Sequence, residues 1–149
     1  MSPVRGLTGW LGTVFAAPDP AGLARFYADL LGGEPDLADP EFVTLQVPGA
    51  TTTYLAFQRE PDHVPPVWPQ GPGDQQMQAH LDVGVRSLPE AVDDAVALGA
   101  RPADHQPQDD VRVLLDPAGH PFCLYVDPGE DPTADGSAGQ AGQAGQAPE

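Results

Sequence analysis

The sequence contains an internal repeat, in which one order of structural signals occurs twice. In the first copy, the apolar segment 12–15 leads to a helix N-cap at Asp19. In the second copy, the segment 80–83 leads to an N-cap at Ser87, with the same spacing between segment and cap. Both helices then end in Leu-Gly. A repeat of this length predicts two similar supersecondary units that share one fold and leave a cleft between them.

Hydrophobic periodicity within each copy predicts a strand, an amphipathic helix and a hairpin. The expected elements are strand 10–16, helix 20–31, hairpin strands 42–47 and 51–58, strand 79–85, helix 88–98, and hairpin strands 111–115 and 122–126. Ser87 and Glu90 are expected to form a capping box at the second helix. On that helix, Leu88, Ala91, Val92, Ala95 and Leu98 are expected to share the buried face.

At 149 residues, the chain is long enough for one domain with a substantial core. We expect that domain to occupy residues 1–127, with halves at about 8–58 and 76–127 and a Pro-rich linker at 59–75. Residues 128–149 repeat Ala-Gly-Gln three times and have little to bury, so they are predicted to be a disordered tail.

The chain is strongly acidic, with a formal net charge of -16 and six basic residues, all arginine. Such a surface repels phosphate backbones and anionic lipids, so we expect neither nucleic acid nor membrane partners. The simpler interpretation of the charge is solubility, or a salt-adapted or GC-rich host. A single cysteine excludes an internal disulfide and indicates a reducing, cytoplasmic location.

Two sequence features resemble a known family: the paired β-α-β-β-β pattern, and the turn DPAGHPF before the last strand. They resemble the vicinal oxygen chelate superfamily, the group of glyoxalases, bleomycin-resistance proteins and extradiol dioxygenases. The segments QMQAHLDVGV and LLDPAGHPFCLYV and the LGA after the second helix are most similar to its glyoxalase-like domain branch in actinobacteria. The resemblance covers roughly residues 8–127. It implies an α+β fold of two half-barrels that enclose a small ligand, within one chain or between the chains of a homodimer.

Strand alternation predicts which side chains face the cleft, because successive residues point to opposite faces of a sheet. The side chains expected in the core are Leu11, Phe15, Leu55, Phe57, Leu81, Val83, Phe122, Leu124 and Val126. Those expected in the cleft are Trp10, Gly12, Val14, Tyr54, Ala56, Gln58, His80, Asp82, Cys123 and Tyr125. An aromatic, mildly polar cleft of this kind suits a planar organic molecule.

The resemblance places the superfamily's four metal-ligand positions at Gly12, Gln58, His80 and Cys123. Gly12 has no side chain, Gln58 is a weak neutral donor, and Cys123 stands where the resemblance implies Glu. A hard octahedral ion prefers carboxylate and water oxygens, which this set lacks. His80 and Cys123 could hold zinc, with Asp82 as a third ligand only if the strand twists. We therefore expect no cofactor, and a divalent metal is the less favoured alternative.

Several candidate residues have a simpler interpretation beside the functional one. His80 is either a hydrogen-bonded pocket histidine or a catalytic group, and Cys123 is either a small buried side chain or a nucleophile. Asp82 either caps a backbone group, pairs with an arginine or acts as a general base. Trp68, in the Pro-rich linker, is expected to close the cleft or to pack in a dimer interface. His120 is expected to serve its turn, and no function is assigned to the other two histidines.

The favoured function is binding of a small aromatic molecule without a complete metal site, of the sequestration or resistance type. The ligand would stack on Trp10, Tyr54 and Tyr125, while Gln58, His80 and Asp82 would orient it. One alternative is a lyase or isomerase of the same superfamily that uses His80 and Asp82 as acid and base. A second alternative is a non-catalytic interaction module whose own side chains fill the cleft.

Overall fold

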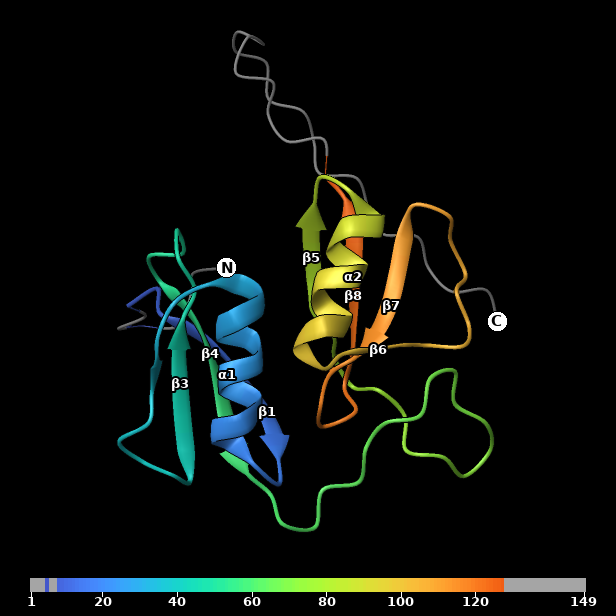
Figure 1. The fold of residues 1–149 in the computed structure, drawn as a ribbon. Helices are drawn as coiled ribbons and strands as arrows, with labels where there is room; N and C mark the ends of the chain where they lie inside the picture. Colours follow the sequence, from blue (N-terminus) through green and yellow to red (C-terminus); the bar gives the residue numbers. More distant parts are fainter. Residues whose placement is uncertain (1–4, 6–7, 128–149) are drawn as a thin grey trace, which may run out of the picture.

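The structure is a computed structural model that describes residue 5 and residues 8–127 (Figure 1). Each half consists of a helix against one face of a four-stranded sheet. The first half contains β1 (Leu11–Ala17), α1 (Pro20–Leu31), β2 (Pro35–Asp36), β3 (Phe42–Gln46) and β4 (Thr53–Arg59). The second contains β5 (Asp82–Val85), α2 (Leu88–Leu98), β6 (Arg101–Pro102), β7 (Val111–Leu115) and β8 (Pro121–Val126). The predicted tail 128–149 lies outside the described residues.

The two sheets have the same topology. Their strand orders are β1-β4-β3-β2 and β5-β8-β7-β6. The pairs β1–β4 and β5–β8 are parallel, and the other pairs are antiparallel. The two related modules predicted from the repeat, and the α+β class implied by the resemblance, are confirmed. The strands β2 and β6 are absent from the predicted elements because two residues are too short to show a hydrophobic period.

Helix α1 forms as its sequence predicts. The Asp19 Oδ1 atom accepts a hydrogen bond from the Gly22 amide at 3.0 Å, and Pro20 occupies the first turn, where its missing N–H is harmless. Helix α2 differs from the prediction at both ends. The Ser87 side chain makes no capping hydrogen bond, so the predicted capping box with Glu90 is wrong. Leu98 is also 39% exposed rather than buried, although Ala95 in the same turn is fully buried.

One hydrophobic core joins the two halves. The Phe26 ring of α1 lies edge-on to Phe122 of β8, with their ring centroids 6.0 Å apart. Helices α1 and α2 contact each other, each in front of its own sheet (Figure 1). Two residues assigned to this core, Leu11 and Val126, are instead 67% and 43% exposed. Both lie at a strand end, where alternation still fixes the face but no neighbouring element covers it.

The linker between the halves lies against the second half. The His63 Nε2–H donates to the Ala118 carbonyl at 2.9 Å. Pro65 packs on Gly119, where an added Cβ would lie 2.7 Å from the proline Cβ. Gly119 also has a φ of +89°, which favours glycine. The linker is thus anchored along the turn between β7 and β8 (Figure 1).

Candidate functional site

On the helix-free face of the first sheet, the ring of Tyr54 covers Gly12. These two residues are partners in the parallel pair of β1 and β4, so both face the same side. A Cβ added to Gly12 would lie 2.6 Å from the Tyr54 Oη and Cε2 atoms, well inside van der Waals contact. The aromatic ring therefore fills the space that a side chain at residue 12 would need.

A hollow of about 270 Å³ lies beside this ring, lined by Trp10, Thr44, Gln46 and Tyr54. The Gln46 Nε2 group donates to the carbonyls of Ala50 and Thr53 at 2.5 and 2.7 Å. Both amide hydrogens are thereby engaged, and the Gln46 carbonyl oxygen is the remaining acceptor of that side chain. Trp10 is 56% exposed, so part of its surface is available to a ligand.

Thr44 and Gln46 are absent from the predicted site. Both lie on β3, where Gln46 is the partner of Tyr54 and Thr44 is the partner of Ala56. Extending the alternation argument from β4 to β3 would have identified them, because partner residues share a face.

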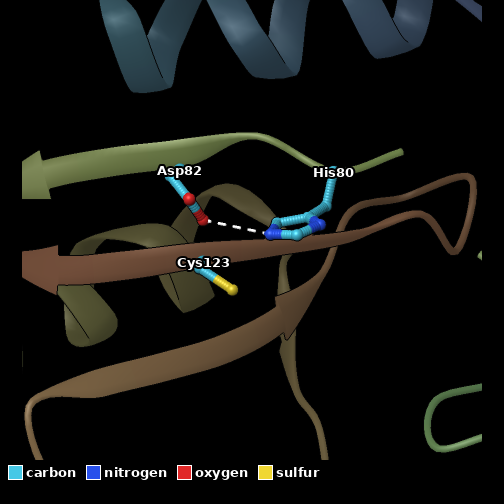
Figure 2. A group of neighbouring side chains, drawn as sticks. All are labelled: His80, Asp82 and Cys123. Carbon is cyan, nitrogen blue, oxygen red and sulfur yellow. Dashed lines mark ion pairs between the residues drawn. The ribbon is translucent and has the colours of Figure 1, made fainter. Parts of the chain in front are cut away.

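The second half carries a cluster of three potential ligands (Figure 2). The His80 Nε2 atom lies 3.2 Å from Asp82 Oδ1, and Cys123 lies beside them on the neighbouring strand β8. One donor atom of each residue lies within 4.8 Å of the others. Asp82 and Cys123 are partners in the β5–β8 pair, and His80 lies two residues before Asp82 on the same face.

The thiol of Cys123 is held in its protonated form. Burial, the negative charge of Asp82 and a hydrogen bond to that carboxylate raise the pKa of Cys123 to about 11. Without a bound cation, the cysteine is therefore a poor nucleophile at neutral pH.

The other predicted residues are dispersed. Tyr125 is the partner of Gly84, and its hydroxyl would lie 3.1 Å from a Cβ on that glycine, which gives the second half its own tyrosine–glycine pair. Gln58 is exposed near the end of β4.

Trp68 is half-buried in the linker, and its ring centroid lies 6.5 Å from that of His105. Trp68 does not line the hollow. In the described residues, the hollow is lined by Trp10, Tyr54 and two β3 residues of the first half, and the His80 cluster belongs to the second half.

Sequence reasoning missed a buried polar network between the halves. The carboxylate of Asp116, which is 1% exposed, accepts hydrogen bonds from the Tyr27 hydroxyl and from the amides of Ala118 and His120, each at 2.9 Å. The His120 Nδ1 atom lies 3.0 Å from the same group, and because a carboxylate only accepts, that nitrogen carries the proton. Burial, and then the charge and hydrogen bond of Asp116, raise the pKa of Tyr27. An Asp in a turn reads as a surface residue, which is why its burial escaped prediction.

A second hollow, of about 440 Å³, lies on the helix side of the other sheet. It is lined by Leu88, Pro89, Val92, Asp93, Asp109, Arg112 and Val126. The Arg112 Nη1 group donates to the carbonyls of residues 108, 109 and 111. This guanidinium nitrogen holds the preceding loop, and the remaining charged groups of the hollow are acidic. The hollow lacks the aromatic surface that distinguishes the smaller one.

The four positions implied by the resemblance do not fit a hard octahedral metal. The Tyr54 ring takes the space at Gly12, and Gln58 contributes only a neutral amide oxygen. His80 and Cys123 offer a nitrogen and a sulfur donor, and the carboxylate beside them belongs to Asp82, which is not one of the four positions. The described part of the chain contains no helix that is long and apolar enough to cross a membrane.

Comparisons with known proteins agree with this fold. A glyoxalase/dioxygenase from Nostoc punctiforme has a similar structure, with a TM-score of 0.61, 19% identity, and coverage of 86% of this chain and 97% of that chain. A glyoxalase-related enzyme from Fulvimarina pelagi gives a TM-score of 0.58, 22% identity, and coverage of 91% and 100%. A glyoxalase/bleomycin resistance protein/dioxygenase family enzyme from Burkholderia phytofirmans PsJN gives 0.55, 17%, and coverage of 76% and 94%.

At these identities, the solved structures show the fold alone. No curated protein matches the sequence. The sequence model of the glyoxalase-like domain, however, matches residues 12–125, which is most of the chain. The protein belongs to the glyoxalase-like domain family of the vicinal oxygen chelate superfamily.

Proposed function

We propose that this protein binds a small planar aromatic molecule on the helix-free face of its first sheet and releases it chemically unchanged. The observation that carries the proposal is the Gly12–Tyr54 pair. The Tyr54 ring fills the space at residue 12, which the resemblance implies as a metal-ligand position, and a second aromatic residue, Trp10, lines the adjacent hollow. The position thus offers a stacking surface where a metal-dependent relative would hold an ion.

The chemistry of the hollow supports this class of ligand. Aromatic pairs contribute about 0.5–1.5 kcal/mol each beyond the area they bury, and Trp10 and Tyr54 provide two such surfaces. The Gln46 carbonyl oxygen supports recognition of an N–H or O–H group on the ligand. The volume of about 270 Å³ lies near the lower end of ligand sites, which suits a small molecule or one end of a larger one.

A homodimer is the second part of the proposal. The apolar residues Trp10, Leu11 and Val14 are exposed around β1, and Tyr125 and Val126 are exposed on β8. Strands β1 and β5 also lie at the ends of their sheets. A second copy that packs on these faces would cover the apolar surface and protect the edges. It would also supply the missing wall of the hollow.

The test of the dimer is the mass in solution by light scattering. Val14→Asp should shift the protein to the monomer, because it places a charge on the covered face. Val96→Asp, an equally exposed valine on α2, should leave the mass unchanged. A wild-type protein that is monomeric at all concentrations would contradict this part of the proposal.

The test of binding is equilibrium dialysis against bleomycin and a panel of planar aromatic compounds, followed by mass spectrometry of the recovered compound. Bleomycin is included because some structural neighbours carry its name. Trp10→Ala and Tyr54→Ala should each weaken binding about two- to tenfold, and Val96→Ala should not. Conversion of the bound compound, or equal binding by all variants, would contradict sequestration at this site.

A lyase or isomerase is the second candidate function, because His80 and Asp82 lie within hydrogen-bond distance and are both accessible. The pair could exchange a proton with a bound substrate. Turnover that Asp82→Asn abolishes and a chelator does not affect would favour this candidate over sequestration. The hollow beside Tyr54 argues against the interaction module, since side chains leave it partly open.

A further inference from the structure

The hollow of about 440 Å³ in the second half shares no lining residue with the aromatic hollow or with the His80 cluster. It lies where the start of α2, the loop before β7 and the end of β8 come together (Figure 1). Arg112 lines it and is the register partner of Leu124, which is buried in the core on the helix side of the sheet. The aromatic ligand is proposed on the helix-free face of the other sheet, so a role for this hollow does not depend on that proposal.

The floor of the hollow is aliphatic. Leu88 is 8% exposed and Val92 is half-buried against the core, so both side chains are held in place. Among the described residues that line the hollow, none is aromatic. The floor can therefore bury an alkyl chain but offers no ring on which a planar molecule could stack. The volume falls within the range of small-molecule sites.

The rim of the hollow is acidic, and its one arginine does not neutralise it. The Arg112 Nη1 group donates to the carbonyls of residues 108, 109 and 111 rather than to a carboxylate. Within the described ranges, neither Asp93 nor Asp109 forms an ion pair. Both residues are exposed, so their carboxylates are accessible to a cation from solvent.

We propose that this hollow binds an aliphatic amine as its ammonium form. The charged nitrogen lies beside Asp93 and Asp109, and the alkyl chain lies on Leu88 and Val92. An ordinary inorganic cation would make no use of the aliphatic floor, and an uncharged hydrocarbon would make no use of the acidic rim. A ligand that carries both parts matches both surfaces.

The sign of the charge follows from the groups around the hollow. Two carboxylates and one guanidinium leave one net negative charge in its lining, which favours a monocation. The start of α2 adds the positive end of a helix dipole, and Glu90 in the first turn of that helix offsets it. The net charge of -16 on the whole chain also concentrates cations near its surface.

The experiment titrates the full chain, with ¹³C-labelled valine methyl groups, with hexylamine, hexan-1-ol and hexanoate. These compounds share one alkyl chain length and are positive, neutral and negative at neutral pH. Hexylamine should shift the Val92 and Val126 resonances saturably, whereas Val96, exposed on the same helix but outside the hollow, should not shift. Hexan-1-ol should bind at least about twofold more weakly, and hexanoate more weakly still, because an exposed ion pair contributes about 1.5- to fivefold.

Asp93→Asn and Asp109→Asn each remove one charge with little change in shape. Each should weaken hexylamine binding about 1.5- to fivefold and leave hexan-1-ol binding unchanged. Asp94→Asn is the matched control, because it neutralises the next residue of α2, which does not line the hollow. It should not weaken binding at about 0.15 M salt, where charges more than about 8 Å apart are largely screened.

Trp10→Ala should bind hexylamine as the wild type does, whether or not an aromatic compound binds at the first sheet, so the two proposals can fail separately. The assignment would be overturned by equal affinities for hexylamine and hexan-1-ol, or by the absence of a saturable shift at Val92. Tighter binding of hexanoate would also overturn it, since the hollow would then select anions through Arg112. Equal losses of affinity in Asp94→Asn and Asp93→Asn would show that the effect is not local to the hollow, and would equally contradict the proposal.

Discussion

The side chain of Tyr54 lies over Gly12, in the space that any other residue at position 12 would occupy. The two residues are register partners, so the arrangement follows directly from the pairing of β1 with β4. A missing side chain on one strand is thus matched by a large aromatic one on its neighbour. The Tyr54 ring thereby forms one wall of the hollow beside Trp10.

A side chain at residue 12 should displace the tyrosine. We expect Gly12→Ala to destabilise the protein by about 1 kcal/mol, at the low end for overpacking, because the far end of the Tyr54 ring can rotate away. The measurement is urea unfolding of Gly12→Ala, of Tyr54→Ala and of the double variant Gly12→Ala/Tyr54→Ala.

The double variant supplies the control, because the clash needs both partners. With Tyr54 truncated, the alanine at residue 12 should be tolerated, and the coupling energy should differ from zero. Additive free energies of unfolding would show that the ring does not constrain residue 12.

The hydrogen bond from Tyr27 to Asp116 should be important for stability, because it joins the halves through a buried carboxylate. Tyr27→Phe removes one donor from that charge and leaves the shape of the core nearly unchanged. We expect a loss of about 1.5–3 kcal/mol in the free energy of unfolding, the range for hydrogen bonds to charged groups. Urea denaturation at neutral pH measures it.

Tyr125→Phe is the matched control, since it removes a hydroxyl from an exposed tyrosine. Its effect should stay within about 0.5 kcal/mol. Equal losses in the two variants would mean that the Asp116 network contributes no more than a surface hydroxyl does.

The thiol of Cys123 should react slowly with iodoacetamide in metal-free protein at pH 8. Because the pKa is about 11, the thiolate fraction and hence the rate should rise about tenfold per pH unit until that value is approached. Asp82→Asn removes a negative charge beside the sulfur, so it should lower this pKa and accelerate alkylation at pH 8. A pH profile that Asp82→Asn leaves unchanged would exclude the carboxylate as a cause of the shift.

Stability should fall in alkaline solution. Cys123 titrates at 9.0 when unperturbed and at about 11 when folded, and the pKa of Tyr27 is raised above its ordinary 10.0. The unfolded chain therefore loses these protons first, so their contribution is complete below pH 9 and is lost as pH rises. Urea midpoints measured from pH 7 to pH 11 should decrease above pH 9. Tyr27→Phe should flatten the decline above pH 10. A slope equal to that of the wild type would mean that Tyr27 does not contribute to the alkaline loss of stability.

The sequence predicted the elements whose signals are local. Helix α1 has a capping aspartate, a proline in its first turn and a regular apolar stripe, and its predicted bounds match the structure. The long hairpin strands were also predicted to within two residues, since each alternates or is continuously apolar. Strand β5 is shorter than expected because its first residues pair only through the Leu81 carbonyl.

Features that depend on tertiary contacts could not be predicted in the same way. The burial of Asp116 depends on Tyr27, which is remote in sequence and reaches it only after the halves pack together. The exposure of Leu98 also differs from the expectation of the helical period, although Ala95, one turn earlier on the predicted face, is fully buried. Alternation identified the faces of Tyr54 and Cys123, but whether those faces meet depends on packing between modules or copies, so the site assignments stay predictions.

The most direct test of aromatic binding beside Tyr54 is ¹⁹F NMR of protein labelled with 5-fluorotryptophan, titrated with a compound retained in dialysis. The chain has two tryptophans, of which Trp10 lines the hollow and Trp68 does not, so the second resonance is an internal control. We predict that the Trp10 resonance shifts with saturation while the Trp68 resonance stays in place. A shift confined to Trp68, or none in either resonance, would contradict binding at this hollow.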